Sequence, residues 1–186
     1  REDIETILKA TPDDRQTILF SATMPKEILD ITNNYQKNPE LIKIKNKQMT
    51  VDSIEQRFYL VDKNKKKSAT ALLLRYYRPK LAIIFCNTKR MVDELVDFLG
   101  KNKFLAQGLH GDVKQQQRTN VMNQFKKGTF NILVATDVAA RGIDVNNLDI
   151  VINYDLPEDN EYYVHRIGRT GRAGNEGKSF TLIDGR

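Results

Sequence analysis

Apolar residues along most of the chain form short runs that alternate with longer amphipathic segments. The runs span residues 81–85, 104–109, 131–135, 149–153 and 179–183. Runs that are apolar almost throughout are typical of strands buried on both faces, as in a parallel sheet. The alternation therefore predicts an α/β fold, in which helices cover both faces of a parallel sheet.

The segments between these runs carry apolar residues at helical spacing. One predicted helix face consists of Met91, Val92, Leu95, Val96 and Leu99, and another of Val121, Met122 and Phe125. Upstream, residues 54–61 alternate as a strand and residues 69–77 predict a helix. The charged run between them, residues 62–67, is interpreted as a solvated turn, with a basic RNA-binding patch as the less favoured alternative.

The first part of the chain has a less complete pattern. Residues 1–11 and the segment that begins at Pro25 predict helices, and residues 16–20 predict a short strand. One strand and its helices are too little for a sheet. We therefore interpret residues 1–46 as the C-terminal remnant of a larger domain plus a linker, and residues 47–186 as a second domain.

Small polar and acidic residues follow four of the predicted strands. They are Asn87-Thr88, His110-Gly111-Asp112, Thr136-Asp137 and Tyr154-Asp155. In open parallel sheets, ligands bind outside the carboxyl ends of the strands, where helix N-termini offer free N–H groups. We expect one binding edge there, able to follow a sugar–phosphate backbone without reading bases. Helix capping explains each residue equally well when it is taken alone, above all Thr88 and Asp112.

The segment 165–172 concentrates positive charge. It holds Arg166, Arg169 and Arg172 with Gly168 and Gly171 between them, and residues 162–175 include no acid. Guanidinium groups match phosphate oxygens, and glycine permits close approach. Cations at the end of a helix predicted over residues 157–164 would explain one arginine, but not three. The pattern favours phosphate recognition.

Composition limits the class of protein without identifying it. The chain has 186 residues and a net charge of +6, which is compatible with nucleic-acid binding. The single cysteine, Cys86, lies in an apolar run and excludes a disulfide framework. The histidines and this cysteine lack metal-ligand spacing, and no apolar run reaches membrane-spanning length. We expect a cytoplasmic protein without a metal site of its own and without a membrane partner.

One segment resembles a nucleotide-binding motif but lacks a residue that the motif requires. Gly177-Lys178-Ser179 is similar to the end of a P-loop, but Arg172 stands where the first glycine is required. No acidic pair for Mg²⁺ follows a predicted strand. The arginines are therefore expected to reach a phosphate bound elsewhere, as an arginine finger does.

Five segments, in order, resemble the motifs of the DEAD-box RNA helicases of superfamily 2. They are residues 21–23 (motif III), 83–88 (motif IV), Gln115 with Arg118 (motif IVa), 135–144 (motif V) and 165–172 (motif VI). His165 favours DEAD-box over DEAH relatives, and the bacterial cold-shock and RNA-degradation helicases are the nearest group. The resemblance implies two RecA-like domains, of which this chain would hold the end of the first and all of the second. The family's P-loop and DEAD carboxylates would lie upstream of Arg1.

The resemblance also implies residue roles. Arg169 and Arg172 would face the ATP γ-phosphate, with Arg169 as the finger, Asp144 would bind the ribose and Gly142 would let the backbone pass nearby. Contacts to RNA phosphates and 2′-hydroxyls would come from Thr88, Gly111, Gln115, Arg118 and Thr136. The two domains would be joined by His165 and Arg141 and coupled by Ser21 and Thr23. ATP and Mg²⁺ would be held mainly by the upstream domain, so the chain alone should not hydrolyse ATP.

RNA and the upstream domain are the expected partners, and proteins of RNA decay or ribosome assembly are further candidates. ATP and RNA together would close the two domains, and the bent RNA strand would leave its duplex. Two other functions stay open at this point. A DNA translocase of the same superfamily would respond to DNA instead of RNA, and a non-enzymatic interaction module would tolerate the loss of Arg169.

Overall fold

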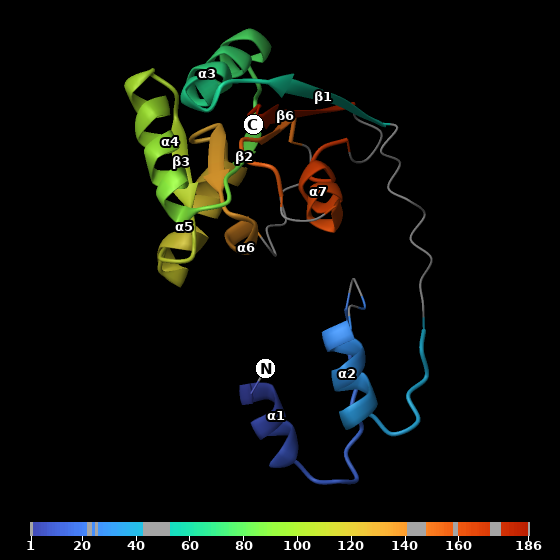
Figure 1. The fold of residues 1–186 in the computed structure, drawn as a ribbon. Coiled ribbons are helices and arrows are strands. Elements are labelled where there is room, and N and C mark those ends of the chain that lie inside the picture. The colour runs from blue at the N-terminus through green and yellow to red at the C-terminus, as the bar shows by residue number, and fades with distance from the viewer. Residues whose placement is uncertain are drawn as a thin grey trace. The chain divides into compact units, whose positions relative to one another are not determined.

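In the computed structural model the chain forms two compact units, residues 1–46 and residues 47–186, which are described separately. The structure describes residues 2–21, 24, 26–42, 53–140, 148–157, 160–171 and 176–185, without the side chains of residues 27, 160 and 161. Figure 1 shows the helices and strands with the labels used below.

The first unit contains helices α1 (Glu2–Lys9) and α2 (Lys26–Tyr35). Acidic residues in the first turn of α1 and Lys9 in its last turn complement the helix dipole. The predicted strand over residues 16–20 is wrong, because no described strand pairs with this segment and a strand is stable only as part of a sheet. Its Phe20 side chain is 93% exposed.

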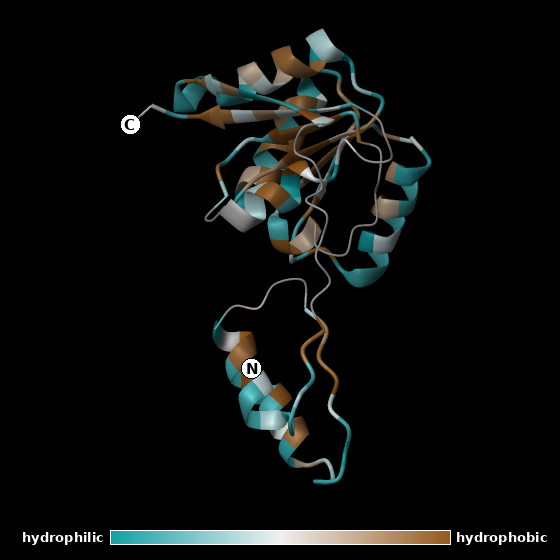
Figure 2. Cartoon of the chain, turned by 90° about the vertical axis from the view of Figure 1, so that its right-hand side faces the viewer, coloured by the Kyte–Doolittle hydropathy of each residue, from teal (hydrophilic) through white to brown (hydrophobic). Residues whose placement is uncertain are grey.

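The second unit is built around a six-stranded sheet with the order β1-β6-β5-β2-β4-β3. The strands are β1 (Ile54–Leu60), β2 (Ala82–Phe85), β3 (Ala106–Leu109), β4 (Ile132–Ala135), β5 (Ile150–Asn153) and β6 (Gly177–Ile183). Every paired neighbour is parallel. This confirms the predicted parallel sheet, and the apolar colouring of the central strands in Figure 2 agrees with the burial of β2, β4 and β5.

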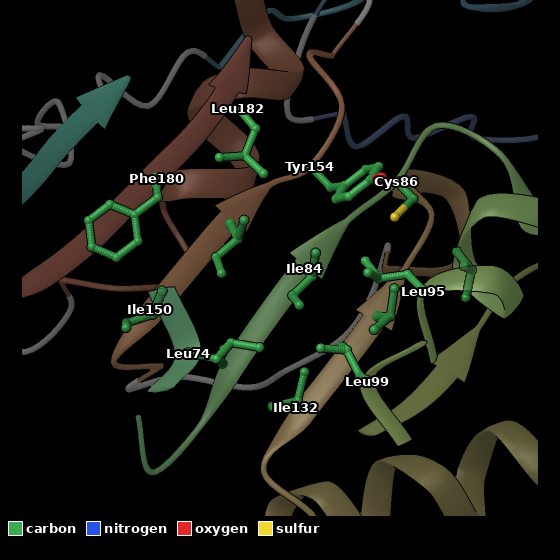
Figure 3. Close-up of a cluster of buried hydrophobic side chains, with 14 residues drawn as sticks. Leu74, Ile84, Cys86, Leu95, Leu99, Ile132, Ile150, Tyr154, Phe180 and Leu182 are labelled. Atoms are coloured by element: carbon green, nitrogen blue, oxygen red, sulfur yellow. The ribbon is translucent and has the colours of Figure 1, made fainter. Parts of the chain in front are cut away.

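Helices cover both faces of this sheet. They are α3 (Lys66–Tyr77), α4 (Lys89–Lys101), α5 (Gln115–Lys126), α6 (Asp137–Ala140) and α7 (Asn160–Ile167), and a 3₁₀ turn, η2 (Lys63–Lys65), precedes α3. On one face α3 and α4 pack Leu74, Leu95 and Leu99 against Ile84 and Phe180 (Figure 3). On the other face, Phe125 of α5 and the alanines of α6 pack against Phe85 and its neighbours.

One local prediction needs correction at the start of α3. The helix begins at Lys66, three residues earlier than predicted, so the supposed solvated turn is a 3₁₀ turn followed by the first helical turn. The side chain of Lys66 is almost completely buried. A charge run alone does not reveal this, because it does not show that Lys66 is buried beside Tyr154 and Asp155 while Lys63 and Lys65 stay exposed.

Candidate functional site

The polar ends of four strands lie along one edge of the sheet. Because β2, β3, β4 and β5 are parallel, the residues that follow them emerge on the same side. Asn87, Gly111, Asp137 and Asp155 therefore share the carboxyl edge of the sheet. This is the edge at which parallel sheets bind ligands.

Arg166 of α7 ties this edge together. Its side chain is 1% exposed, and its Nε and Nη2 donate hydrogen bonds of 2.7 and 2.6 Å to the two carboxylate oxygens of Asp137. Nη2 also donates to Oδ1 of Asn87 at 3.0 Å, and Nη1 donates to the carbonyl oxygen of Asp155 at 2.6 Å. The guanidinium carbon lies 5.1 Å from the centre of the Phe85 ring. One side chain thus connects α7 to the ends of β2, β4 and β5.

For Arg166, the prediction of an arginine without an acidic partner is wrong. A buried guanidinium must be paired, and its partner Asp137 lies 29 residues away in sequence. The partner is therefore not visible in the sequence around Arg166. The only hint of it is that Asp137 follows an apolar strand at the predicted binding edge. Arg166 is therefore used by the fold and does not offer its charge to a phosphate.

Asp155 extends the network towards α3. One of its carboxylate oxygens accepts from the Asn87 backbone N–H at 3.0 Å, and the other lies 3.5 Å from Nζ of Lys66. Lys66 is 3% exposed, with Asp184 at 3.7 Å and the centre of the Tyr154 ring at 5.0 Å. Burial, and then the nearby Asp155 carboxylate, raise the pKa of Tyr154. The phenol therefore stays neutral beside this ion pair.

Arg169 lies between two anchored neighbours in the turn after α7. Arg166 precedes it, and Thr170, which is also 1% exposed, forms an isolated parallel bridge with Leu148. The Thr170 hydroxyl donates to the Leu148 carbonyl oxygen, and the Arg169 backbone N–H donates to the Arg166 carbonyl oxygen at 3.2 Å. Arg169 itself is partly buried, whereas His165 on α7 is exposed.

Five predicted site residues lie outside the described part of the chain. They are Thr23, Arg141, Gly142, Asp144 and Arg172. Ser21 is described and is exposed in the first unit.

The capping explanation holds for Thr88 and fails for Asp112. The Thr88 hydroxyl accepts from the Met91 backbone N–H at 3.2 Å and caps α4. Asp112 instead accepts from Nζ of Lys89 at 2.6 Å, and this pairing lowers the pKa of Asp112. Asp112 therefore links the loop after β3 to the start of α4, and α5 begins without a side-chain cap.

The remaining predicted RNA contacts come from the loops and helix starts of the same edge. Gln115 and Arg118 lie in the first turn of α5, and Nη2 of Arg118 donates to the Ala139 carbonyl oxygen at 2.6 Å. Thr136 directly precedes α6 and is partly buried. At Gly111, an added Cβ would meet no atom within 4 Å. The described protein therefore does not itself require a glycine at this position.

Gly171 has a structural explanation that differs from the phosphate approach expected from sequence. Its φ is +66°, and a Cβ there would lie 2.6 Å from Ile54 and 3.0 Å from the Ser53 hydroxyl. That hydroxyl donates to the Gly171 carbonyl oxygen at 2.9 Å. The glycine thus lets the turn after α7 pack against the start of β1.

The described residues also bear on metal binding, membrane insertion and cysteine chemistry. They contain no group of three or more His, Cys, Asp or Glu side chains placed to hold a metal ion. None of the helices described is both long enough and apolar enough to cross a membrane. Cys86 is buried, and burial raises the pKa of its thiol, which makes it a poor nucleophile.

Comparison with known proteins adds a family to this geometry. The helicase conserved C-terminal domain family matches residues 64–174. The chain is 51% identical over 185 residues to an ATP-dependent RNA helicase CshA of Listeria monocytogenes, covering all of this chain and 36% of the relative. It is 50% identical over 182 residues to a DEAD-box ATP-dependent RNA helicase CshA of Geobacillus kaustophilus, covering 98% of this chain and 39% of the relative. The chain thus spans less than half the length of these relatives.

Solved structures agree with the sequence relatives. A DEAD box protein from Methanococcus jannaschii matches with a TM-score of 0.68 and 44% identity, over 98% of this chain and 49% of that one. A variant of Dbp5 from Saccharomyces cerevisiae, bound to RNA and ADP BeF3, matches with a TM-score of 0.82 and 29% identity, over 100% of this chain and 49% of that one.

Proposed function

The chain belongs to the helicase conserved C-terminal domain family, in its DEAD-box branch with a RecA-like fold, and from this membership we propose that it serves ATP-dependent unwinding of RNA. It acts as the second domain of a longer protein. It supplies an arginine finger to an ATP molecule held mainly, with Mg²⁺, by an upstream domain. Its carboxyl edge binds the RNA backbone.

The observation that carries the proposal is the fixed backbone position of Arg169 between Arg166 and Thr170. Both neighbours are buried and anchored to strand ends or to the segment before β5. An arginine finger stabilises charge in the transition state only if its guanidinium is already in place when the cleft closes. The pairing of Arg166 with Asp137 therefore supports the catalytic role of its neighbour. Arg172, outside the described residues, is the second proposed contact to the γ-phosphate.

The RNA part of the proposal rests on the carboxyl edge. Thr88, Gly111, Gln115, Arg118 and Thr136 all follow strand ends or begin helices at this edge. Helix N-termini there favour phosphate oxygens, and the open space at Gly111 lets a backbone approach closely. We therefore propose contacts to phosphates and sugar hydroxyls that carry no sequence preference.

The remaining roles follow from the family. Gly142 and Asp144 are proposed to border the nucleotide ribose, and His165 and Arg141 to join the two domains. Ser21 and Thr23 are proposed to couple hydrolysis to RNA binding from the first domain. The exposed Ile7, Ile18 and Phe20 support the proposal that residues 1–46 belong to a larger first domain, since such apolar side chains are normally covered.

The test is the RNA-stimulated ATPase activity of this chain joined to the upstream domain of its longer protein, with and without Arg169→Ala. We expect the substitution to lower kcat by about 10³-fold, the scale of an arginine finger, with little change in the KM for ATP. Arg57→Ala is a matched control, because it removes an exposed arginine paired only with surface groups. Equal activity of the two variants would show that Arg169 has no catalytic role.

The same assay separates the nucleic acids. Poly-uridylate RNA should stimulate hydrolysis, and single-stranded DNA of matching length should not. Stimulation by both would instead favour the DNA translocase alternative.

A further inference from the structure

A hollow of about 430 Å³ opens at the opposite edge of the sheet, where the strands begin. Its walls come from the end of α3, the loop that leads to β2 and the residues before β3 and β4. Ile132 in its lining is the first residue of β4, whereas Asp137 follows the last residue of that strand. The full length of the strand therefore separates this hollow from the Arg166 network.

The hollow has an apolar floor and a basic rim. Leu74 and Ile132 form the floor and are 2% and 1% exposed, and Figure 3 shows both side chains on the same face of the sheet. Arg75 and Arg78 form the rim and are exposed. The Arg75 guanidinium is already oriented, since Nη2 donates to Oδ1 of Asn102 at 3.2 Å. Its guanidinium carbon lies 5.7 Å from the centre of the Phe104 ring.

Arg78 has an unfavourable backbone conformation for its residue type. Its φ and ψ are 45° and 57°, and its N–H donates to the Leu74 carbonyl oxygen at 3.0 Å to end the helix. Glycine is the usual residue at such a helix end, and a residue before proline is normally extended. The loop is held in place by the Asn131 side-chain amide, which donates to the Pro79 carbonyl oxygen at 3.1 Å. A strained non-glycine residue in a well-held loop is a reason to seek a function for its side chain.

The surroundings of Arg78 are basic. Lys80 follows two residues later and is exposed, and the exposed Arg75 lines the same hollow. The nearby acid Asp149 is used by the loop itself, because its carboxylate accepts from the Lys80 backbone N–H at 2.6 Å. Within the described part of the chain, the Arg78 guanidinium has neither a hydrogen bond nor an ion pair. The dipole of α3 favours a cation at its C-terminal end, but it does not explain a strained arginine beside an apolar floor.

We propose that this feature, the Arg78 hollow, docks a short acidic segment of a partner protein. One apolar side chain of the segment lies on Leu74 and Ile132, and flanking carboxylates pair with Arg75 and Arg78. Arginine forks bind carboxylates in a bidentate manner, and an aliphatic floor suits a leucine or phenylalanine side chain. A nucleotide base would find few polar partners on this floor. The hollow is distant from the carboxyl edge, so the proposal does not depend on the function proposed above.

Fluorescence anisotropy tests this proposal. The 186-residue chain is titrated into a fluorescein-labelled, glutamate-rich peptide that has one central phenylalanine. The first variant is Arg78→Gly, which removes the guanidinium and relieves the backbone strain, so it should fold well. The matched control is Lys103→Gly, because Lys103 also has a positive φ of 65° and one positive charge but does not line the hollow. We expect Arg78→Gly to weaken binding by about tenfold and Lys103→Gly by less than about twofold. Arg75→Gln should weaken binding as Arg78→Gly does.

Amide chemical shifts locate the bound peptide. Shifts at Leu74, Arg78 and Ile132, but not at Asn87 or Gly111, would support the proposal. Replacing the phenylalanine of the peptide with serine should weaken binding further. The proposal is overturned if the peptide does not bind, if Arg78→Gly and Lys103→Gly weaken it equally, or if oligoadenylate RNA binds the hollow more tightly than the peptide.

Discussion

Two arginines at opposite edges of the same sheet are held in opposite ways. At the carboxyl edge, Arg166 is 1% exposed and its hydrogen bonds reach Asp137, Asn87 and Asp155. At the amino edge, Arg78 is exposed on a strained backbone. The first is part of the fold, whereas the second keeps a left-handed backbone conformation that is costly for a residue other than glycine. The contrast indicates that an arginine points to a function most clearly when its guanidinium has no hydrogen-bond partner within the fold.

The largest effect is expected at Arg166. Arg166→Ala leaves the Asp137 carboxylate without its partner and should lower the free energy of unfolding by about 3–5 kcal/mol. Urea unfolding followed by circular dichroism measures this change. Arg90→Ala is the control, because Arg90 forms an exposed pair with Glu94 four residues away near the start of α4, so its loss should hardly change the free energy of unfolding. Similar losses in the two variants would show that the buried network contributes little.

This contrast also explains what could be predicted from the sequence. The parallel sheet was predictable because strands such as β2 and β4 are apolar throughout, and burial on both faces leaves this local pattern. The pairing of Arg166 with Asp137 was not predictable, because it depends on which strand ends the topology brings together. The strand predicted near Phe20 was wrong for the same reason. A strand forms only when other strands pair with it, and the segment's own sequence does not show whether such partners are present.

The next largest effect is expected at Gly171, where the turn after α7 meets the start of β1. Gly171→Ala places a Cβ at a positive φ and in close contact with Ile54, so it should lower the free energy of unfolding by about 2–4 kcal/mol. Gly128→Ala is a matched control, since its φ is +72° but its Cβ would meet no atom within 4 Å. It should cost about 1 kcal/mol, from backbone strain alone. If both variants unfold at the same urea concentration, packing against Ile54 does not explain the glycine.

A smaller effect at Thr88 separates capping from RNA binding. Thr88→Ala removes the N-cap of α4 and should lower the free energy of unfolding by about 1 kcal/mol. Thr88→Asp keeps a side-chain acceptor for the helix and should retain that stability, but it brings a negative charge to the proposed RNA edge. In the chain joined to its upstream domain, Thr88→Asp should therefore weaken RNA binding more than Thr88→Ala does. The opposite order in a binding titration would limit Thr88 to its capping role.

At the amino edge the expected change has the opposite sign. Arg78→Gly should raise the free energy of unfolding by about 0.5–1 kcal/mol, because glycine adopts the observed φ without strain. Lys103→Gly should give a similar gain. Thermal unfolding of the two variants measures the gain. A loss of stability in Arg78→Gly alone would mean that its side chain supports the fold, which would remove the contrast with Arg166.

The smallest effect concerns Glu94, a partly exposed acid on α4 near the same carboxyl edge as Arg166. Hydrogen bonds from Lys67 and then Arg90 lower the pKa of Glu94. A carboxylate with a lowered pKa in the folded state stabilises the fold above its unfolded pKa, and this stability is lost as the pH falls through the folded value. The relevant window therefore lies at and below about pH 4.3, the ordinary value for glutamate. Glu94→Gln should flatten the loss of stability across this window, as acid titrations of the unfolding midpoint would detect.

Ionic strength tests the cause of that effect. Lys67 and Arg90 lie near helix N-termini, where the dipole disfavours cations, so Glu94 offsets positive charge at the starts of both α3 and α4. Because Glu94 and both of its cationic partners are reached by solvent, about 1 M salt should remove most of the difference between Glu94→Gln and the native chain. The same salt should hardly change the cost of Arg166→Ala, because the buried pair is shielded from ions. Equal sensitivity of both variants to salt would mean that burial does not distinguish the two networks.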